Sequence, residues 1–347
     1  MGKLFSESIQ EVNKSISYCN YICSEAHAIL MPNKDIENLE INYFPIGVIF
    51  GVMPWNFPLW QVIRFALPAL IVGNGVILKH APNVTGLSIY IERIIKESGF
   101  STDIFRSLII SNDMVHKVIE NDKIHAVSFT GSDKVGSLIA STAGKNIKKT
   151  VLELGGSDPF IILDDADIDI AFDAAFKARM QNMGQSCIAG KRFIIEESIY
   201  NRFIDYIYTR IESLVVGDPF DPLTLVAPLS TLAAKENANR QVLDFVNEGA
   251  EVIVPRNDII SDGFYYMPRI ITNVNTAMVT LKEEIFAPIF TIIPSSKDRI
   301  LYHANDTIYG LGASVWTSDK EFASYMASNI NSGMVFINEI TMSSPEI

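Results

Sequence analysis

The sequence contains few cysteines and no excess of basic residues, and both shortages exclude classes of protein. Only three cysteines occur among 347 residues, Cys19, Cys23 and Cys187, so a disulfide framework is excluded and a reducing compartment is favoured. Lys and Arg number 28 against 40 Asp and Glu, which gives a formal net charge of -12. Because nucleic-acid binding depends on basic side chains that neutralise phosphates, we expect no nucleic-acid partner.

Long uninterrupted apolar runs are also missing. Residues 1–11 lack the continuous apolar core of a secretory signal. The nearest approach to a membrane span, residues 46–63, is interrupted by two prolines, Asn56 and Gln61, and is more typical of a buried strand followed by a turn. We therefore predict a cytoplasmic protein with no membrane partner. Its 48% hydrophobic content is enough for two domains with sizeable cores.

A metal site has little support in the sequence. Cys19, Cys23 and His27 follow one another at four-residue spacing and would share one helical face. Structural zinc sites usually draw two pairs of ligands from separate elements, and the sequence offers no second pair. We therefore predict that the chain holds no metal.

The first part of the chain predicts a helix and two strands. Residues 6–31 predict one helix with an apolar stripe that includes Val12 and Ile16. Residues 38–44 predict a polar strand. The near-continuous apolar run at residues 46–53 is typical of a strand that is buried on both faces of a parallel sheet.

Beyond this run the first half alternates strand and helix patterns. The predicted strands cover residues 76–79, 105–110, 126–130 and 151–154, and the predicted helices cover 59–72, 85–98, 113–121 and 133–142. This alternation predicts a doubly wound parallel sheet with right-handed crossovers. Such sheets bind ligands, often nucleotides, beyond the carboxyl ends of their strands.

The second half repeats the α/β pattern after a domain boundary that we expect at Leu154. The predicted strands cover residues 160–163, 192–196, 251–254, 289–294, 313–316 and 334–338, and the main predicted helices cover 167–180, 198–215 and 231–248. We therefore predict two α/β domains, residues 1–154 and 155–347.

Residues 181–193, Q-N-M-G-Q-S-C-I-A-G-K-R-F, place Cys187 in a turn-like segment between a helix-like and a strand-like run. A thiolate held in such a turn is a candidate nucleophile, with neighbouring backbone N–H groups free to face a substrate. The alternative is a small buried hydrophobic residue, which is the commoner role of a single cysteine.

Three further features lie at predicted strand ends. Gly131 to Gly136, G-S-D-K-V-G, joins a strand to a helix and is a candidate anion site, although it matches neither the Walker A loop nor the three-glycine dinucleotide motif. Lys79 could reach a ribose or phosphate oxygen, and Glu153 could act as a general base. A tight turn, a solvated lysine and an ordinary strand-end glutamate are the alternatives.

Five motifs occur in an order typical of one enzyme family. They are P-W-N-F-P at residues 54–58, F-T-G-S-D-K-V-G at 129–136, L-E-L-G-G at 152–156, G-Q-S-C at 184–187 and E-E-I-F-A-P at 283–288. They resemble, in that order, the oxyanion-site turn, phosphate loop, general-base, nucleophile and ribose-contacting segments of the aldehyde dehydrogenase superfamily, with Ala287 where glycine is usual. The resemblance covers nearly the whole chain and implies a dinucleotide-binding domain at residues 1–154 and a catalytic domain at 155–347.

The resemblance implies a role for individual residues. Cys187 would attack an aldehyde, Asn56 would help to hold the oxyanion, and Glu153 would activate water against the resulting thioester. The residues implied in cofactor binding are Trp55, Lys79, Gly131, Ser132, Glu284 and Phe286. The cofactor would be NADP or NAD, because Pro82 stands where NAD-preferring members often carry a glutamate.

Within the superfamily, residues 78–84 and 154–160 look most like bacterial succinate-semialdehyde dehydrogenases. Arg64 lies where members of that group carry an arginine that holds the substrate carboxylate, which suits bidentate pairing. Gln181, in contrast, stands where some of them place a second arginine. The expected reaction is therefore oxidation of succinate semialdehyde to succinate.

The resemblance also implies that segments are missing at both ends, with roughly 80 residues absent before the start, as judged from ordinary domain sizes. The resemblance assigns residues 38–44 to an oligomerisation strand, which would present an unpaired edge without the missing ends. The protein would be a homo-oligomer if this interface survives. The alternative to an active enzyme is a truncated, inactive remnant that serves as a binding or subunit-interaction module. An acyl transferase that uses coenzyme A is less favoured, because Glu153 is present to activate water.

Overall fold

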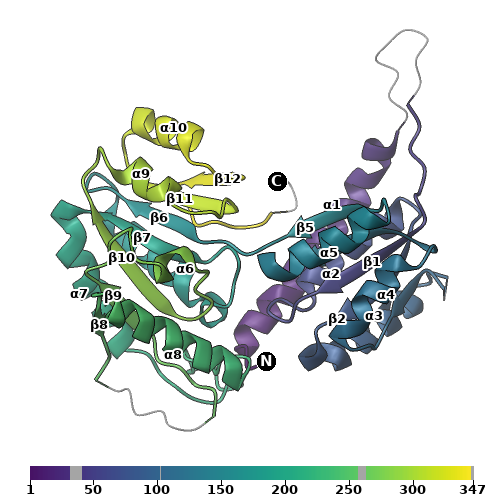
Figure 1. The fold of residues 1–347 in the computed structure, drawn as a ribbon, viewed down its shortest axis with the longest axis horizontal. Helices are drawn as coiled ribbons and strands as arrows, with labels where there is room; N and C mark the ends of the chain where they lie inside the picture. Colours follow the sequence, from purple (N-terminus) through teal and green to yellow (C-terminus); the bar gives the residue numbers. More distant parts are fainter. Residues whose placement is uncertain (32–40, 102, 257–262, 345–347) are drawn as a thin grey trace. The chain divides into compact units, whose positions relative to one another are not determined.

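The computed structural model describes residues 1–31, 41–101, 103–256 and 263–344 (Figure 1). The chain forms two compact units. We call Ser8–Leu154, with Ser344, the N-terminal unit, and Gly155–Ser343, with Met1–Glu7, the C-terminal unit. Each is described by itself. Within the described residues, no helix combines the length and apolar character that a bilayer span requires.

The N-terminal unit contains a parallel five-stranded sheet with the order β3-β2-β1-β4-β5. The strands are β1 (Val48–Met53), β2 (Gly75–His80), β3 (Phe105–Ser107), β4 (Ile124–Thr130) and β5 (Lys149–Glu153). The helices between them are α2 (Trp60–Ile71), α3 (Thr85–Glu97), α4 (Val115–Glu120) and α5 (Asp133–Lys145). This is the predicted doubly wound sheet, because the strand order runs outward from β1 in both directions.

Two apolar clusters cover the two faces of this sheet. Val62 of α2 and Ile91 of α3 pack with Leu78 of β2. Ile139 of α5, with Ile119 of α4, packs with Phe50 of β1. Burial on both faces explains why these strands consist of apolar runs rather than alternating apolar and polar residues.

The strand register brings the ends of four strands to one edge of the sheet. Val52 pairs with Lys79 and with Phe129, and Thr130 pairs with Glu153. The residues that follow β1, β2, β4 and β5 therefore leave the sheet at the same carboxyl edge. Because the strand order reverses at β1, this edge has the crevice in which doubly wound sheets bind ligands.

The C-terminal unit contains a seven-stranded sheet with the order β12-β11-β6-β7-β10-β9-β8. Its strands are β6 (Asp158–Ile162), β7 (Gly190–Glu196), β8 (Glu251–Ile253), β9 (Arg269–Thr272), β10 (Ile289–Ser295), β11 (Gly312–Trp316) and β12 (Met334–Ile337). Its helices are α6 (Ile168–Met180), α7 (Tyr200–Glu212), α8 (Leu232–Asn247), α9 (Ile300–Asn305) and α10 (Lys320–Asn329). All neighbouring strands are parallel except β8 and β9. The core includes stacked or tilted ring pairs among Phe160, Phe193 and Phe290.

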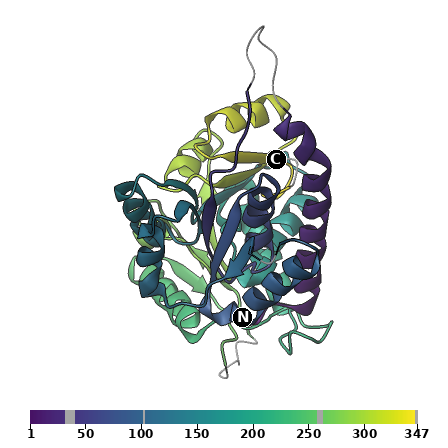
Figure 2. The same ribbon diagram turned by 90° about the vertical axis from the view of Figure 1, so that its right-hand side faces the viewer.

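Helix α1 (Phe5–Leu30) forms where a helix was predicted (Figure 2). Its predicted apolar stripe, however, is wrong. Val12 and Ile16 are 41% and 53% exposed, whereas Glu11 and Ser15 are buried. The polar face is buried because the Glu11 carboxylate accepts the first N–H groups of α2, from Leu59 at 2.8 Å and from Trp60 at 3.0 Å.

The predicted strand at residues 38–44 is not found in its described part. Residues 38–40 lie outside the described residues, and residues 41–44 contain a single bridging position, Ile41, instead of a strand. An extended segment becomes a strand only when a neighbouring strand supplies hydrogen bonds along its length. Its predicted role in oligomerisation stays a prediction.

Candidate functional site

The P-W-N-F-P turn follows β1 at the carboxyl edge of the N-terminal sheet, with Asn56 buried at 4% exposure and Trp55 half-buried. His80, the last residue of β2, holds this turn. Its Nε2 donates to the Pro58 carbonyl at 2.8 Å, and the Ala81 N–H donates to its Nδ1 at 3.0 Å. Burial lowers the pKa of His80, which favours the neutral ring. The turn that carries Asn56 is therefore fixed from a neighbouring strand.

Lys79 precedes His80 in β2 and is also buried. Its Nζ donates to the Asn112 side-chain oxygen, and burial lowers its pKa. Because β2 ends next to β1, the ammonium group lies at the carboxyl edge of the sheet, as the sequence predicted.

The loop after β4 opens helix α5 as an anion-binding helix start does. Ser132 is the N-cap of α5, and its hydroxyl accepts from the Val135 N–H at 3.4 Å. A Cβ added at Gly131 would lie 2.5 Å from the Phe129 ring, and one at Gly136 would lie 2.5 Å from the Leu154 side chain. A side chain at either position would have to displace one of these neighbours, so glycine lets the backbone lie close to them at a helix start that can bind a phosphate.

Glu153 ends β5, and its side chain lies near that of Arg64 on α2. Arg64 Nη2 is 3.7 Å from Glu153 Oε2 and donates to Gln61 Oε1 at 2.9 Å. The Arg64 and Glu153 side chains are 28% and 40% exposed. The predicted general base and the predicted substrate arginine therefore form a loose, solvent-accessible ion pair in this unit.

In the C-terminal unit, the segment before Cys187 makes a left-handed turn. Asn182, Met183 and Gly184 have φ angles of 51°, 55° and 71°. Left-handed geometry costs roughly 1–2 kcal/mol for each non-glycine residue, so the turn needs support from its surroundings. Glu7 Oε1 accepts from the Asn182 N–H at 2.6 Å, and Arg179 Nη2 donates to the Gly184 carbonyl at 2.6 Å.

Cys187 lies between this turn and β7 and is partly exposed. Its backbone carbonyl accepts from Lys191 Nζ at 2.6 Å. Gly156 approaches the same carbonyl so closely that a Cβ there would lie 2.7 Å from the oxygen. The backbone of the predicted nucleophile is thus fixed on both sides.

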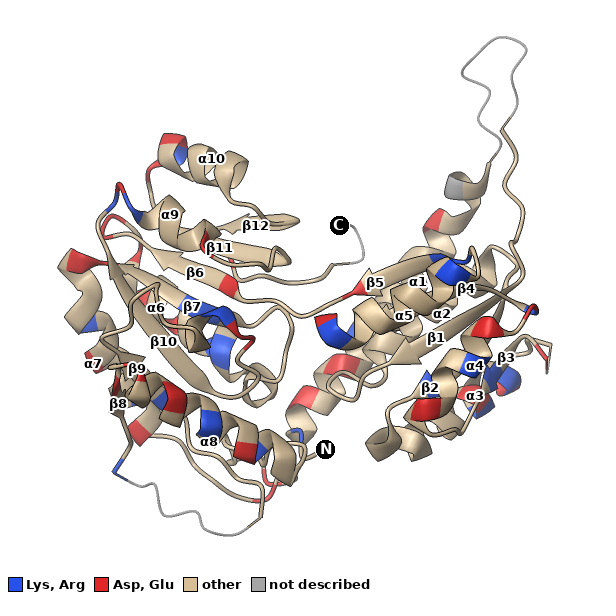
Figure 3. Ribbon diagram, viewed as in Figure 1, with Lys and Arg blue, Asp and Glu red and all other residues tan. Residues whose placement is uncertain are grey.

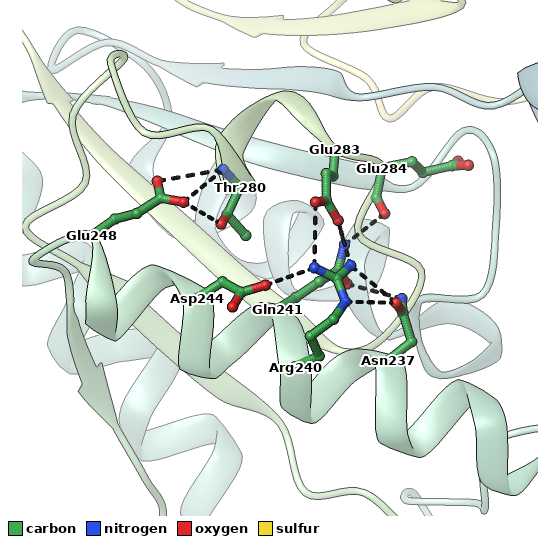
Figure 4. Close-up of polar contacts among 8 residues, drawn as sticks. All are labelled: Asn237, Arg240, Gln241, Asp244, Glu248, Thr280, Glu283 and Glu284. Atoms are coloured by element: carbon green, nitrogen blue, oxygen red, sulfur yellow. Dashed lines mark hydrogen bonds and ion pairs between the residues drawn. The ribbon is translucent and has the colours of Figure 1, made fainter.

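The E-E-I-F-A-P segment is anchored to α8, and its two glutamates make different contacts (Figure 4). Glu283 pairs with Arg240 at 2.6 Å, and this hydrogen-bonded pairing lowers the pKa of Glu283. Glu284 turns away from α8, while its backbone carbonyl accepts from Gln241 Nε2 at 3.1 Å. Its carboxylate Oε1 accepts from Lys191 Nζ and from the Gly156 N–H, both at 3.1 Å. Phe286, two residues further on, is half-buried.

What we call the buried charge cluster consists of four buried charged residues, Asp158, Arg179, Lys191 and Arg192, together with the half-buried Glu284. Burial raises the pKa of Asp158 to about 7, and Lys191 opposes this rise. Burial lowers the pKa of Arg179 to about 9 and that of Arg192 to about 10.

Outside this cluster, acidic and basic residues are interspersed along the helices of each unit (Figure 3).

The structure thus gathers the predicted residues into one group per unit. Asn56, Trp55, Lys79, Gly131, Ser132, Arg64 and Glu153 lie in the segments at or beyond the carboxyl edge of the N-terminal sheet. Cys187 and Glu284 share Lys191 as a partner in the C-terminal unit. The sequence reasoning missed Lys191, His80 and Glu11. Two adjacent cations in the apolar run G-K-R-F-I-I were the available signal for Lys191.

Comparison with known proteins identifies the family. The model of the aldehyde dehydrogenase family matches residues 1–347. The chain belongs to this family. A family member from Mycobacterium avium (strain 104), succinate-semialdehyde dehydrogenase (NADP(+)), is 39% identical over 354 residues, which cover 100% of this chain and 75% of that relative.

Solved structures of aldehyde dehydrogenases agree in fold. The crystal structure of succinic semialdehyde dehydrogenase from Streptococcus pyogenes in complex with NADP+ has a TM-score of 0.96 at 37% identity, covering 99% of this chain and 77% of that one. That of succinate-semialdehyde dehydrogenase from Burkholderia pseudomallei has a TM-score of 0.95 at 27% identity, covering 99% and 73%. The predicted family and fold are therefore confirmed. The predicted cofactor class, NADP or NAD, agrees with the cofactor named for the relatives.

Proposed function

We propose that this aldehyde dehydrogenase oxidises succinate semialdehyde to succinate with NADP or NAD. The observation that carries the proposal is Cys187 on a fixed left-handed turn, with its carbonyl and the Glu284 carboxylate bound to one buried ammonium group. Such a turn costs energy, and strain of this kind is concentrated at functional sites. The names of the relatives supply the reaction class.

The chain's own residues would do the following. Cys187 Sγ attacks the aldehyde carbon, and the Asn56 amide and the Cys187 N–H donate to the developing oxyanion of the thiohemiacetal. Bound NADP or NAD would supply the two-electron oxidant that converts the thiohemiacetal of Cys187 into a thioester. Glu153 then takes a proton from a water molecule, and the hydroxide attacks the thioester carbonyl, which releases the acid and the Cys187 thiol.

The N-terminal unit fits a dinucleotide. The start of α5, capped by Ser132 and without a side chain at Gly131, can hold a pyrophosphate. Lys79 lies near the end of β2, which β1 separates from β4, and it can hold a ribose or phosphate oxygen at the same edge of the sheet. Trp55 lies in the turn after β1, at the switch point of the sheet. In the C-terminal unit, Glu284 and Phe286 would contact the nicotinamide ribose region. The two units are then the dinucleotide-binding and catalytic domains.

Arg64 would hold the substrate carboxylate. Its guanidinium is partly exposed, and its pairing with Glu153 at 3.7 Å is long for an ion pair. A substrate carboxylate that binds bidentately would replace this contact with a stronger one. Glu153 would then be released near the position where a base is needed. We also propose a cytoplasmic homo-oligomer, in which residues 38–44 pair between subunits.

The test is a spectrophotometric assay of NADPH and NADH formation with succinate semialdehyde, using the purified protein beside Cys187→Ala. We expect turnover by the wild type and none by the variant, while both give the same circular-dichroism spectrum. A folded wild-type protein without turnover would favour a binding or subunit-interaction module instead.

A further inference from the structure

Lys191 is a buried lysine with two partners, a backbone carbonyl in the segment of Cys187 and a carboxylate in the E-E-I-F-A-P segment. Its side chain is 1% exposed. Nζ lies 2.6 Å from the Cys187 carbonyl oxygen and 3.1 Å from Glu284 Oε1. An ammonium group that has lost its water is retained only where such partners compensate for its desolvation.

Glu284 forms its ion pair with this ammonium group, and the buried Arg179 guanidinium also attracts its charge. Its Oε1 accepts from Lys191 and from the Gly156 N–H, and its backbone is held by Gln241. Its neighbour Glu283 pairs with Arg240 on α8. Each glutamate of the E-E pair therefore has its own cation, and only the cation of Glu284 also binds the nucleophile segment.

We propose that Lys191 is a positioning residue that ties the cofactor-binding carboxylate Glu284 to the backbone of Cys187. The inference rests on the proposed function, because it takes from it the roles of Glu284 and Cys187. One buried cation then sets both the orientation of the carboxylate toward the cofactor ribose and the position of the nucleophile's peptide group. Loss of the cation disturbs both, although Lys191 itself contacts neither substrate nor cofactor.

A double-mutant cycle tests the link to Glu284. Lys191→Met, Glu284→Gln and the double variant are compared with wild type by isothermal titration of NADP, which needs no turnover. We expect each single change to raise the Kd for NADP about 10-fold or more, since each removes a partner of a buried charge pair. The double variant should be no more than about threefold weaker than the worse single variant, because both act through one interaction.

The link to Cys187 is tested by alkylation with iodoacetamide, read as mass on the peptide that carries Cys187 and therefore not affected by Cys19 or Cys23. Lys191→Met should alkylate Cys187 at least threefold more slowly than wild type, whereas Glu284→Gln should stay within twofold. Lys177→Met, which breaks the exposed pair with Asp173, is the matched control and should change neither readout.

The proposal would be overturned if the increase in the NADP Kd of the double variant equalled the product of the increases in the two single variants. Equal alkylation rates in Lys191→Met and wild type would also overturn it. If Lys191→Met does not fold, Lys191→Gln is used, because its amide can still donate to the Cys187 carbonyl without the charge. Lys191→Gln should bind NADP more weakly and keep the wild-type alkylation rate. Wild-type NADP affinity together with the wild-type alkylation rate would overturn the proposal. Turnover by wild type is measured separately, so failure of the proposed function is seen in that assay alone.

Discussion

Two ion pairs of a basic residue with a glutamate, Lys191–Glu284 and Arg64–Glu153, lie at the predicted sites of this protein. They differ in distance and in exposure to solvent. Lys191 and Glu284 are 3.1 Å apart with side chains 1% and 18% exposed. Arg64 and Glu153 are 3.7 Å apart with side chains 28% and 40% exposed. The first pair has further hydrogen bonds to backbone groups that fix its geometry, whereas the second is loose and partly in contact with water.

The difference matches what each carboxylate is proposed to do. A carboxylate that holds a ribose needs one orientation, and a buried pair with additional hydrogen bonds provides it. A general base must change its contacts during a reaction cycle. A solvent-exposed ion pair contributes little stabilisation free energy and therefore permits that change. The same pairing of charges therefore serves to fix one glutamate and to leave the other mobile.

The largest expected effect comes from breaking the buried pair. Lys191→Met removes the buried cation of the pair, leaves the half-buried Glu284 without it, and should lower the free energy of unfolding by up to roughly 3–5 kcal/mol, as measured by urea denaturation. Lys177→Met at the exposed pair with Asp173 is the control and should cost less than about 1 kcal/mol. Similar losses in the two variants would show that burial does not separate the two kinds of pair.

The pH dependence of stability should reveal the buried charge cluster. Burial raises the pKa of Asp158 to about 7 in the folded protein, against 3.8 for an ordinary aspartate, so the folded state keeps a proton that the unfolded chain releases. Stability from this group is therefore complete below about pH 4 and is lost as the pH rises through about 7. Asp158→Asn should not show this loss. The unfolding free energy of the variant minus that of the wild type should therefore increase between pH 5 and pH 7. A constant difference would contradict the raised pKa.

The exposed pair should matter for substrate binding. Arg64→Ala should raise the KM for succinate semialdehyde by roughly 10- to 100-fold, because a charged hydrogen-bonded partner of the substrate carboxylate is lost, at about 1.5–3 kcal/mol. The KM for butyraldehyde, which lacks the carboxylate, should change little. Equal changes for the two aldehydes in steady-state kinetics would remove Arg64 from this role.

The smallest effect is expected on stability at the same position. Arg64→Met keeps the aliphatic part of the side chain and removes only the loose contact with Glu153 and the hydrogen bond to Gln61. The free energy of unfolding should fall by less than about 1 kcal/mol. A loss as large as that of Lys191→Met would show that the Arg64 pair is structural.

Much of the fold could be predicted from the sequence, because strands buried on both faces are apolar runs and the segments between them have helical periodicity. The motif glycines and charged residues follow these runs, so their meeting at one edge could be predicted as well. Strand β9 (Arg269–Thr272) was not among the predicted strands. The boundary at Leu154 was expected, whereas the placement of Met1–Glu7 in the C-terminal unit depends on contacts such as that of Glu7 with Asn182.

Side-chain partners that are distant in sequence could not be predicted. The sequence shows Lys191 and Arg192 side by side in β7 but does not show that both are buried, or that Glu284 and Asp158 balance them. For α1, apolar periodicity indicated the wrong face, since Glu11 is buried in order to cap α2. A buried polar residue is determined by the group that it binds, and that group is not visible in the local pattern.

The central claim is that Cys187 is the thiol nucleophile and Glu153 the base that frees the acid from it. Glu153→Gln should slow hydrolysis, so that incubation with succinate semialdehyde and NADP, followed by acid quenching and peptide mass spectrometry, traps one succinyl group on the peptide that carries Cys187. The adduct should be absent without NADP and absent in the double variant with Cys187→Ala. An adduct on Cys19 or Cys23, or none on Cys187 while the variant still binds NADP, would contradict the account.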